Sequence, residues 1–361
     1  TGTEAYAYFL ITALIPLAAA RNHTLRLYFN QAPPVGLFPE APHVETAVLP
    51  QRRLWTHIRL ARELRQNPPD VFFTPAHVIP LTYRGPSVAT IHDLGYHHFP
   101  EAHPRKQLAY LRWSTRHNGR SATRIIADSQ ATKTDLIQID HIAAEKIDVV
   151  YPGIDPELAP VSDKEGITAV LQKYGITPPY FLYIGTLQPR KNLVRLIQAF
   201  ANSHVPHQLV LAGKTGWLSQ PILDEIARVE REIHNSQFTI HNSQFVLPGY
   251  IEEADKPALL TAATALLFPS LYEGFGFPAL EAQACATPVL TSNTSSMPEV
   301  VGDSAIQVDP LNTAAISNAI QNLASDSPLC QQLVQKGFEN VKRFTWSETA
   351  VHVLNTVENA P

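Results

Sequence analysis

Two adjacent cations, Arg190 and Lys191, have a placement that suggests chemistry. They follow an apolar run that ends in Gly185-Thr186, and a helix-type pattern begins directly after them. An arginine fork, a lysine point charge and the unpaired N–H groups of a helix N-terminus can together bind a phosphate or diphosphate without a metal ion. An isolated Arg-Lys pair is more often a solvated surface doublet, so this interpretation depends on finding other binding groups at the same edge of the fold.

A glycine turn between two glutamates provides such groups. Glu273 and Glu281 enclose the segment Gly274-Phe275-Gly276-Phe277-Pro278-Ala279-Leu280, whose proline suits the first position of a helix. The two glycines allow backbone N–H groups to approach a phosphate or a sugar hydroxyl closely. Glu281, in the first helical turn, can accept hydrogen bonds from a ribose diol, whereas Glu273 precedes the turn. Two glutamates at a helix start are also common on protein surfaces, so this element indicates a binding site only if it lies beside the two cations.

Other patterns lack the spacing that their chemistry needs. Gly213-Lys214-Thr215 resembles the end of a P-loop, but Gln208 stands where that motif requires a glycine. Gly274–Ala279 resembles a dinucleotide fingerprint, yet residues 291–293 lack an acidic residue for the ribose, which leaves nicotinamide binding a weak alternative. The histidines at 92, 97, 98 and 103 fit no closed zinc pattern, and no Asp-x-Asp pair occurs. We therefore expect no metal site.

Short β-rich runs alternate with helical stretches along the whole chain, which predicts an α/β fold of parallel sheets with helices on both faces. We expect two Rossmann-like, doubly wound domains that face each other across a cleft, formed by residues 1–160 and 161–345. Residues 346–361 should form a helix that returns to the first domain. Ligands of such sheets bind at the carboxyl ends of the strands, where both motifs fall.

The first domain has five predicted strands: Thr24–Asn30, Asp70–Thr74, Ser87–Ile91, Thr123–Asp128 and Ile147–Tyr151. Its predicted helices are Glu4–Ala20, Arg53–Arg65, Arg105–Arg120 and Gln130–Asp140. No strand precedes the glycine turn Thr1-Gly2-Thr3, so we expect the first strand of this domain upstream of the sequence. The segment Ile233–Phe238 recurs as Ile240–Phe245, which we interpret as a duplication within a loop.

Composition describes an ordinary globular protein. The 361 residues are 45% hydrophobic and 17% charged, and the net charge of −4 provides no general field for nucleic acid. Two cysteines cannot form a disulfide framework, which favours a cytoplasmic location. The uncharged stretch between Glu4 and Arg21 is interrupted by Pro16 and is shorter than a spanning helix needs, so we expect a buried helix.

These motifs together resemble glycosyltransferase family 4. The resemblance rests on Arg190-Lys191-Asn192, on the Glu273-x7-Glu281 element and on Thr90-Ile91-His92-Asp93, with Tyr151–Asp155 at the domain junction. It covers nearly the whole chain. It implies the GT-B fold and retaining, metal-independent transfer of a sugar from a nucleotide sugar, with UDP-glucose as the first choice of donor and GDP-mannose as the second. It also implies that the leaving diphosphate acts as the base, so the protein positions groups and stabilises charge.

The resemblance also assigns roles to residues. Arg190 and Lys191 would hold the donor diphosphate, and Glu281 the ribose. Glu273 would bind the sugar hydroxyls, and His92 would lie near the sugar and the attacking acceptor. The expected catalytic residues are His92, Glu273, Arg190 and Lys191. The expected donor-binding set is Gly2, Thr3, Gly185, Thr186, Arg190, Lys191, Tyr250, Ile251, Glu273, Gly274, Phe275, Gly276, Leu280 and Glu281.

The first domain should receive the acceptor, a growing polysaccharide or oligosaccharide on a lipid carrier. Six basic residues and no acidic one lie between Glu101 and Asp128, and three of the arginines share one face of the predicted helix beside Trp113: Arg112, Arg116 and Arg120. This face suits an anionic lipid or a lipid diphosphate, and equally a solvated helix surface. Two other functions remain open: a nucleotide-sugar epimerase of the same fold, and a non-catalytic sugar-nucleotide-binding protein.

Overall fold

The computed structural model describes residues 2–76, 78–235 and 244–360, so most of the duplicated loop lies outside the described residues. The chain forms two compact units. The first contains Thr1–Leu94, Arg105–Gly153 and Phe344–Pro361, and the second contains Gly95–Pro104 and Ile154–Arg343. This division differs from the predicted one at Gly95–Pro104, which the sequence assigned to the first domain. The segment belongs to the second unit, where its His98 ring stacks on the Tyr272 ring at a centroid distance of 4.6 Å.

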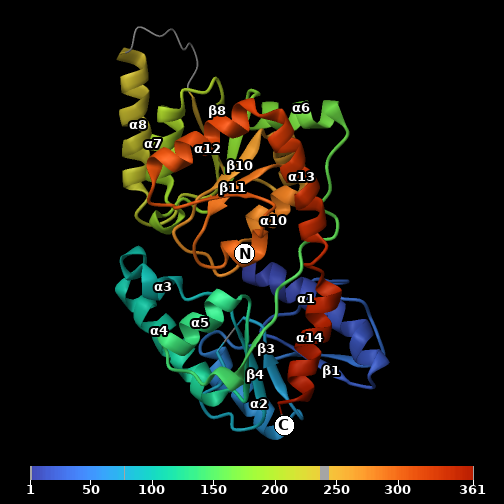
Figure 1. The fold of residues 1–361 in the computed structure, drawn as a ribbon. Helices are drawn as coiled ribbons and strands as arrows, with labels where there is room; N and C mark the ends of the chain where they lie inside the picture. The colour runs from blue at the N-terminus through green and yellow to red at the C-terminus, as the bar shows by residue number, and fades with distance from the viewer. Residues whose placement is uncertain (1, 77, 236–243, 361) are drawn as a thin grey trace. The chain divides into compact units, whose positions relative to one another are not determined.

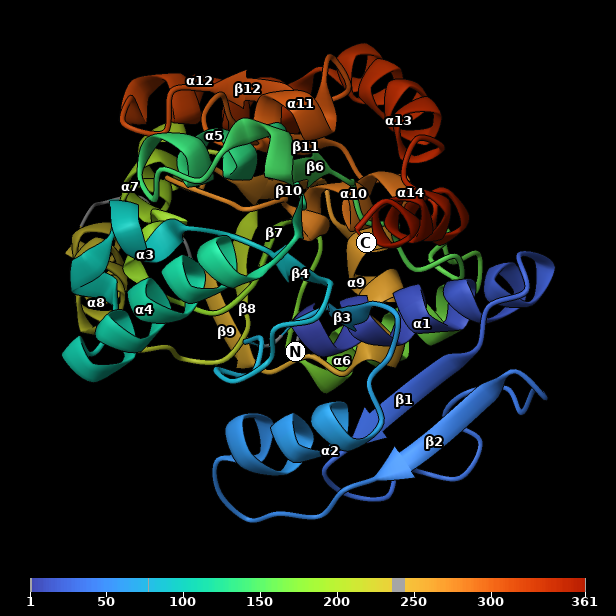
Figure 2. The same cartoon turned by 90° about the horizontal axis from the view of Figure 1, so that it is seen from below.

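The first unit contains two parallel sheets. A four-stranded sheet has the order β3 (Phe72–Thr74), β4 (Ser87–Ile91), β5 (Arg124–Ala127) and β6 (Ile147–Val149). A separate pair consists of β1 (Leu25–Phe29) and β2 (Val44–Val48), which lie side by side in Figure 2. All five residues of β4 are buried, as expected for a strand in the interior of a parallel sheet. Sequence analysis missed β2, most of which is exposed.

Two helices from opposite ends of the sequence form the core of the first unit. In α1 (Gly2–Ala20), Tyr6, Leu10 and Leu14 pack against α14 (Trp346–Glu358), and Trp346 contacts the ring of Tyr6. The predicted helix Glu4–Ala20 agrees with α1, which continues through Pro16. By length and composition α1 could cross a membrane, contrary to the expectation that this stretch is too short. Only part of the helix, including Tyr6, Leu10 and Leu14, is buried in this core. The other helices of this unit are α2 (Ala61–Gln66), α4 (Arg105–Ser121) and α5 (Gln130–Gln138).

The second unit is built on one six-stranded parallel sheet, part of which is visible in Figure 1. Its order along the sheet is β12 (Ile306–Val308), β11 (Val289–Ser292), β10 (Ala265–Phe268), β7 (Tyr180–Ile184), β8 (Gln208–Ala212) and β9 (Phe245–Gly249). The chain therefore moves outward from β7 in one direction and from β10 in the other. This is the strand order of the Rossmann fold, and its switch point lies between β7 and β10.

Helices cover the second sheet in two groups. The first group comprises α7 (Leu193–Ser203), α8 (Gln220–Asn235) and α12 (Thr313–Ser325), and the second comprises α9 (Lys256–Ala262), α10 (Phe277–Ala284) and α13 (Ser327–Val341). Right-handed crossovers place α7 and α10 on opposite faces, because the chain leaves β7 and β10 in opposite directions. Short helices α6 (Lys164–Lys173) and α11 (Met297–Val301) complete the unit, and α3 (Gly95–His98) lies in its added segment. The predicted motifs thus begin where β7 and β10 end.

Candidate active site

The loop after β7 is shaped by two glycines. Gly185 has a φ of +151° and Gly213, at the end of the neighbouring strand β8, has a φ of +146°. A Cβ atom on Gly213 would lie 1.9 Å from the carbonyl oxygen of Gly185, so the two backbones cross too closely for any side chain. This explains a glycine in Gly213-Lys214-Thr215, a segment that the sequence had excluded as a P-loop. The close crossing fixes the path of the chain toward Thr186, which is exposed.

Asn192 anchors the turn that carries the cations. It has a left-handed backbone conformation, with a φ of +62°, between the short 3-10 turn Pro189–Lys191 and α7. Its side-chain amide donates hydrogen bonds to the carbonyl oxygens of Pro269 (3.0 Å) and Pro310 (2.6 Å). The backbone N–H of Leu271 also donates to the carbonyl of Arg190 at 2.9 Å. The loops after β7 and β10 are therefore tied together across the switch point.

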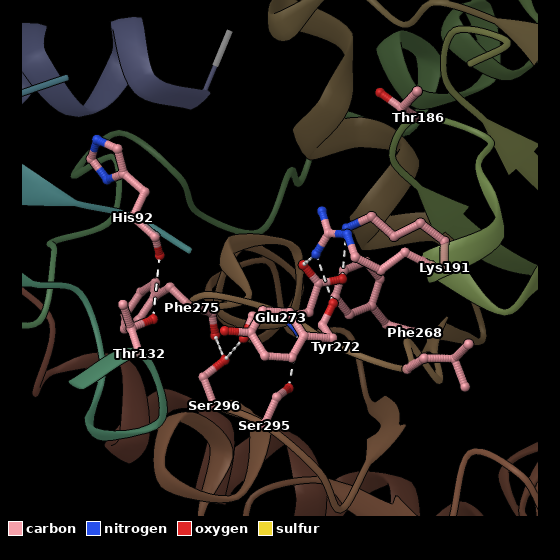
Figure 3. A network of polar contacts seen from close by, with 12 residues as sticks. His92, Thr132, Thr186, Lys191, Phe268, Tyr272, Glu273, Phe275, Ser295 and Ser296 are labelled. Carbon is pink, nitrogen blue, oxygen red and sulfur yellow. Dashed lines mark hydrogen bonds and ion pairs between the residues drawn. The ribbon is translucent and has the colours of Figure 1, made fainter. Parts of the chain in front are cut away.

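Glu273 joins both cations in a buried cluster (Figure 3). Lys191 Nζ lies 2.6 Å from Glu273 Oε1 and 5.0 Å from the centre of the Phe268 ring. Arg190 Nη1 lies 3.1 Å from Glu273 Oε2 and donates a 2.7 Å hydrogen bond to the carbonyl of Tyr272. The side chains of Lys191 and Glu273 are only 10% and 8% exposed. Two cations and one carboxylate leave a local excess of positive charge, which suits an anionic ligand.

The ion pairs control the protonation of Glu273. Burial acts to raise the pKa of Glu273, but the charges of Lys191 and Arg190 outweigh burial and hold the pKa below its ordinary value. Glu273 is therefore an ionised hydrogen-bond acceptor at neutral pH. It is suited to bind hydroxyl groups rather than to donate a proton.

Backbone contacts hold the glycine turn of this cluster. The N–H of Glu273 donates to Ser295 Oγ at 2.9 Å, and the Ser296 hydroxyl contacts the carbonyl oxygens of Glu273 and Phe275 at 3.0 and 2.9 Å. Gly276 caps α10 with a φ of +106°, and a Cβ atom there would lie 2.6 Å from Met297 Sδ. The turn is thus built in a conformation that favours glycine, at the N-terminus of α10.

The residues expected around the nucleoside differ in accessibility. Glu281 is paired with Lys256 at 2.9 Å, and its side chain is 18% exposed. Burial acts to lower the pKa of Lys256, but Glu281 and Glu253 raise it above the ordinary value. Leu280, also in the expected donor-binding set, is completely buried.

Residues after β8 and β9 form a second cationic contact. Tyr250 is 56% exposed, whereas its neighbour Ile251 is buried. Lys214 Nζ lies 4.8 Å from the centre of the Tyr250 ring, within the range of a cation–π interaction. Lys214 was not predicted as a site residue, because the P-loop spacing around it fails. It missed Lys256 because no motif includes it.

Gly2, Thr3 and His92 belong to the first unit. Gly2 and Thr3 form the first turn of α1, and a Cβ atom on Gly2 would meet nothing within 4 Å. Both ring nitrogens of His92 are engaged: Nδ1 lies 2.6 Å from Asp128 Oδ2 and Nε2 lies 2.8 Å from the carbonyl oxygen of Pro75. Asp128 was not predicted, because an acidic residue after a strand has no distinctive spacing from a histidine 36 positions earlier.

Among residues 2–76, 78–235 and 244–360, no group of three or more His, Cys, Asp or Glu side chains is arranged to hold a metal ion. Within the second unit the structure brings together Arg190, Lys191, Glu273 and the glycine turn at the carboxyl edge of a parallel sheet. These features, in a chain of two α/β units, define a glycosyltransferase of GT-B fold.

The chain belongs to glycosyltransferase family 4. Residues 2–158 match the family described as Glycosyltransferase Family 4, and residues 168–340 match Glycosyl transferases group 1. The chain is 30% identical over 341 residues to O-antigen chain mannosyltransferase B of Escherichia coli, covering 93% of this chain and 83% of that protein.

Two further comparisons agree with this assignment. A serotype-specific mannosyltransferase of Escherichia coli, WbdA, is 28% identical over 63% of this chain, a match that spans 28% of that longer protein. HepE of Anabaena, whose crystal structure holds UDP and glucose, has a TM-score of 0.73 at 21% identity and covers 99% of this chain and 96% of its own. At that identity the likeness to HepE shows the fold alone.

Proposed function

We propose that this enzyme transfers mannose from GDP-mannose, with retention of configuration, to a growing lipid-linked O-antigen-type polysaccharide. The observation that carries the proposal is the buried Arg190–Lys191–Glu273 cluster at the switch point of the second sheet. The choice of mannose is supported by the mannosyltransferases that the chain resembles over most of its length. Glucose from UDP-glucose, the first choice from sequence, becomes the second candidate. The relatives are transferases, which disfavours the epimerase alternative.

In this proposal the two cations hold the diphosphate. An ammonium has three N–H donors and a guanidinium has five, more than the single Glu273 carboxylate can accept. As the bond to the sugar breaks, negative charge grows on the diphosphate, and Arg190 and Lys191 stabilise it more strongly. Their charges perform the task that a divalent cation performs in other nucleotide-sugar enzymes, so the reaction should need no metal.

The remaining groups orient the sugar and the nucleoside. The ionised Glu273 and the backbone N–H groups of the Gly274–Gly276 turn would bind sugar hydroxyls. Glu281 would exchange its contact with Lys256 for the ribose diol or share it. Thr186 and Tyr250, both exposed at strand ends, are available to the nucleotide.

We further propose that the acceptor reaches the enzyme at the cytoplasmic face of an anionic membrane, through α4. Arg112, Trp113, Arg116 and Arg120 line an open cavity of about 510 Å³ on this helix, together with Ala109 and His117. Trp113 and Tyr110 are 40% and 52% exposed, which suits a membrane interface. Asp140 forms an ion pair with Arg116 and so reduces the positive charge of this face.

The membrane proposal is tested by replacing three arginines with serine: Arg112, Arg116 and Arg120. Binding to anionic liposomes at low salt should weaken by about 1 kcal/mol per residue, because each arginine interacts with the surface potential. Donor binding should be unchanged, since none of its expected contacts lies on α4. Liposome binding equal to that of the wild type would show that α4 is a solvated surface.

The donor is tested by a thermal-shift panel of GDP-mannose, UDP-glucose and ADP-glucose. All three are used at one concentration, so the ligand with the lowest dissociation constant stabilises the folded state most; a ligand at 100 times its dissociation constant adds about 2.7 kcal/mol. GDP-mannose should give the largest shift. A larger shift with UDP-glucose would overturn the mannose assignment, and no shift with any nucleotide sugar would overturn the donor site.

A further inference from the structure

His92 and Asp128 meet at the carboxyl edge of the first unit's sheet. Strands β4 and β5 are parallel neighbours in which Ile91 pairs with Ala127. His92 and Asp128 are the next residues on each strand, so the register places them opposite each other. His92 Nδ1 lies 2.6 Å from Asp128 Oδ2, a distance typical of a charge-assisted hydrogen bond.

The other ring nitrogen is held by a third strand end. His92 Nε2 lies 2.8 Å from the carbonyl oxygen of Pro75, the residue that follows β3. The ring of Tyr6, from α1, packs edge-on against the imidazole at a centroid distance of 4.7 Å and an interplanar angle of 77°. The imidazole is therefore fixed at both nitrogens and on one side of its plane.

These contacts determine how many protons the ring and the carboxylate hold. A carbonyl oxygen only accepts, so Nε2 must carry a proton. At 2.6 Å, Nδ1 and Oδ2 need a second proton between them, because two lone pairs would otherwise face each other. The backbone carbonyl and the carboxylate together thus specify a doubly protonated imidazole beside an ionised aspartate, or the equivalent in which Asp128 holds the shared proton.

The surroundings of the pair favour retention of that proton. Asp128 is only 2% exposed, and its second oxygen, Oδ1, is buried without a hydrogen bond among the described residues. Burial acts to lower the pKa of His92, but Asp128 and Asp93 raise it above the ordinary value. The titratable groups acting on the pair are Tyr6 from α1 and Asp93 from the loop after β4; neither is a cation. His92 is therefore the countercharge that Asp128 contacts directly.

We propose that Asp128 is a positioning residue for sugar transfer: it retains the second proton on the His92–Asp128 pair and makes Nε2 a fixed, charge-assisted hydrogen-bond donor. In the structure this donor is directed at the carbonyl oxygen of Pro75. The proton stays on Nε2 throughout, so His92 acts as a donor and never as the base. This inference rests on the proposed function and on the role near the sugar that the family resemblance gives to His92.

The first test needs no substrate and no variant. The full chain labelled with 15N-histidine is titrated by NMR, and the His92 signals are assigned with His92→Gln. The His92 signals should show no titration as the pH rises through the ordinary histidine pKa of about 6.5, because the His92–Asp128 pair keeps both protons. In Asp128→Asn, His92 should titrate near or below that value. A wild-type His92 that loses a proton near pH 6.5 would overturn the proposal.

The second test measures turnover against pH. Wild-type kcat should be flat between about pH 6 and 8, whereas Asp128→Asn should lose about tenfold as the pH rises past about 6.5 and recover at acidic pH. Asp148→Asn is the matched control: Asp148 lies on β6 and is paired with Arg124 of the neighbouring strand β5, not with His92. It should leave the profile unchanged.

The two tests separate the possible failures. If no nucleotide sugar supports transfer, the proposed function fails, while the NMR titration still decides the protonation of the pair. If Asp128→Asn lowers kcat equally at every pH and GDP binding is unaffected, the role of Asp128 is structural and the proposal is wrong. Superimposable profiles for the wild type and Asp128→Asn would also overturn it.

Discussion

Replacing Glu273 with glutamine isolates the charge of the buried cluster. The amide keeps the shape of the side chain but removes the charge that contacts Lys191 Nζ at 2.6 Å and Arg190 Nη1 at 3.1 Å. Removing one partner from a buried pair costs about 3–5 kcal/mol, because the other charges remain buried without compensation. For a unit of this size, each kcal/mol lowers Tm by about 2–4 °C, so Glu273→Gln should melt about 6–20 °C lower.

The loss should depend on pH in a defined direction. The pKa of Glu273 is lowered in the folded protein, so its ion pairs stabilise fully above the ordinary glutamate pKa of about 4.3. That stabilisation disappears as the pH falls through the lowered pKa. The difference between wild type and Glu273→Gln should thus be constant from about pH 5 to 8 and shrink in stronger acid.

Inorganic pyrophosphate provides the assay that tests the reasoning. In Glu273→Gln two buried cations lack a carboxylate, so pyrophosphate should raise Tm more in the variant than in the wild type. Glu232→Gln is the control, because Glu232 pairs with Arg228 at the surface with 65% of its side chain exposed, and its loss should cost less than about 1 kcal/mol. A variant destabilised no more than this control, or one that pyrophosphate stabilises less than the wild type, would refute the account of the cluster.

Three further predictions concern single residues. Lys191→Ala should lower kcat by about 10²–10³-fold with a smaller change in donor affinity. Glu281→Ala should mainly raise the donor KM, because the ribose does not change during the reaction. Steady-state kinetics distinguish the two variants, and equal effects on KM would contradict the assignment. Gly213→Ala should fail to fold or should unfold at a much lower denaturant concentration, because its Cβ would lie 1.9 Å from the Gly185 carbonyl oxygen; a wild-type midpoint would disprove this close approach. Native-state alkylation, followed by mass spectrometry, should modify Cys330 before Cys285, because the Cys285 thiol is buried and its pKa is raised to about 12. The reverse order would show that the core around Cys285 opens.

The sequence predicted the alternation of strands and helices well because most strands are buried, continuous apolar runs. The prediction for β4, Ser87–Ile91, matches its observed bounds, and all of its residues are buried. Strand β2 was missed because it is largely exposed and its Glu45 and Thr46 dilute the apolar signal. Helix α1 was predicted as Glu4–Ala20 and runs through Pro16, but its packing against α14 at the far end of the chain could not be read from a local pattern.

The site was predictable where its residues are adjacent in sequence. Arg190 and Lys191 stand together at a predicted strand end, so their shared location followed from the sequence alone. Their ion pairs with Glu273, 82 positions later, depend on the order of β7 and β10 in the sheet, which no spacing encodes. Asp128 was missed for the same reason, since strand register alone brings it to His92.

The most direct test of the account is mannose transfer from GDP-mannose by the purified chain, measured before and after exhaustive chelation with EDTA. Arg190 and Lys191 are assigned the charge stabilisation of the leaving diphosphate, so the rate should be the same in both conditions, with the anomeric configuration of the donor retained in the product. A rate that disappears with EDTA and returns with Mg²⁺ or Mn²⁺ would contradict the role of these two cations.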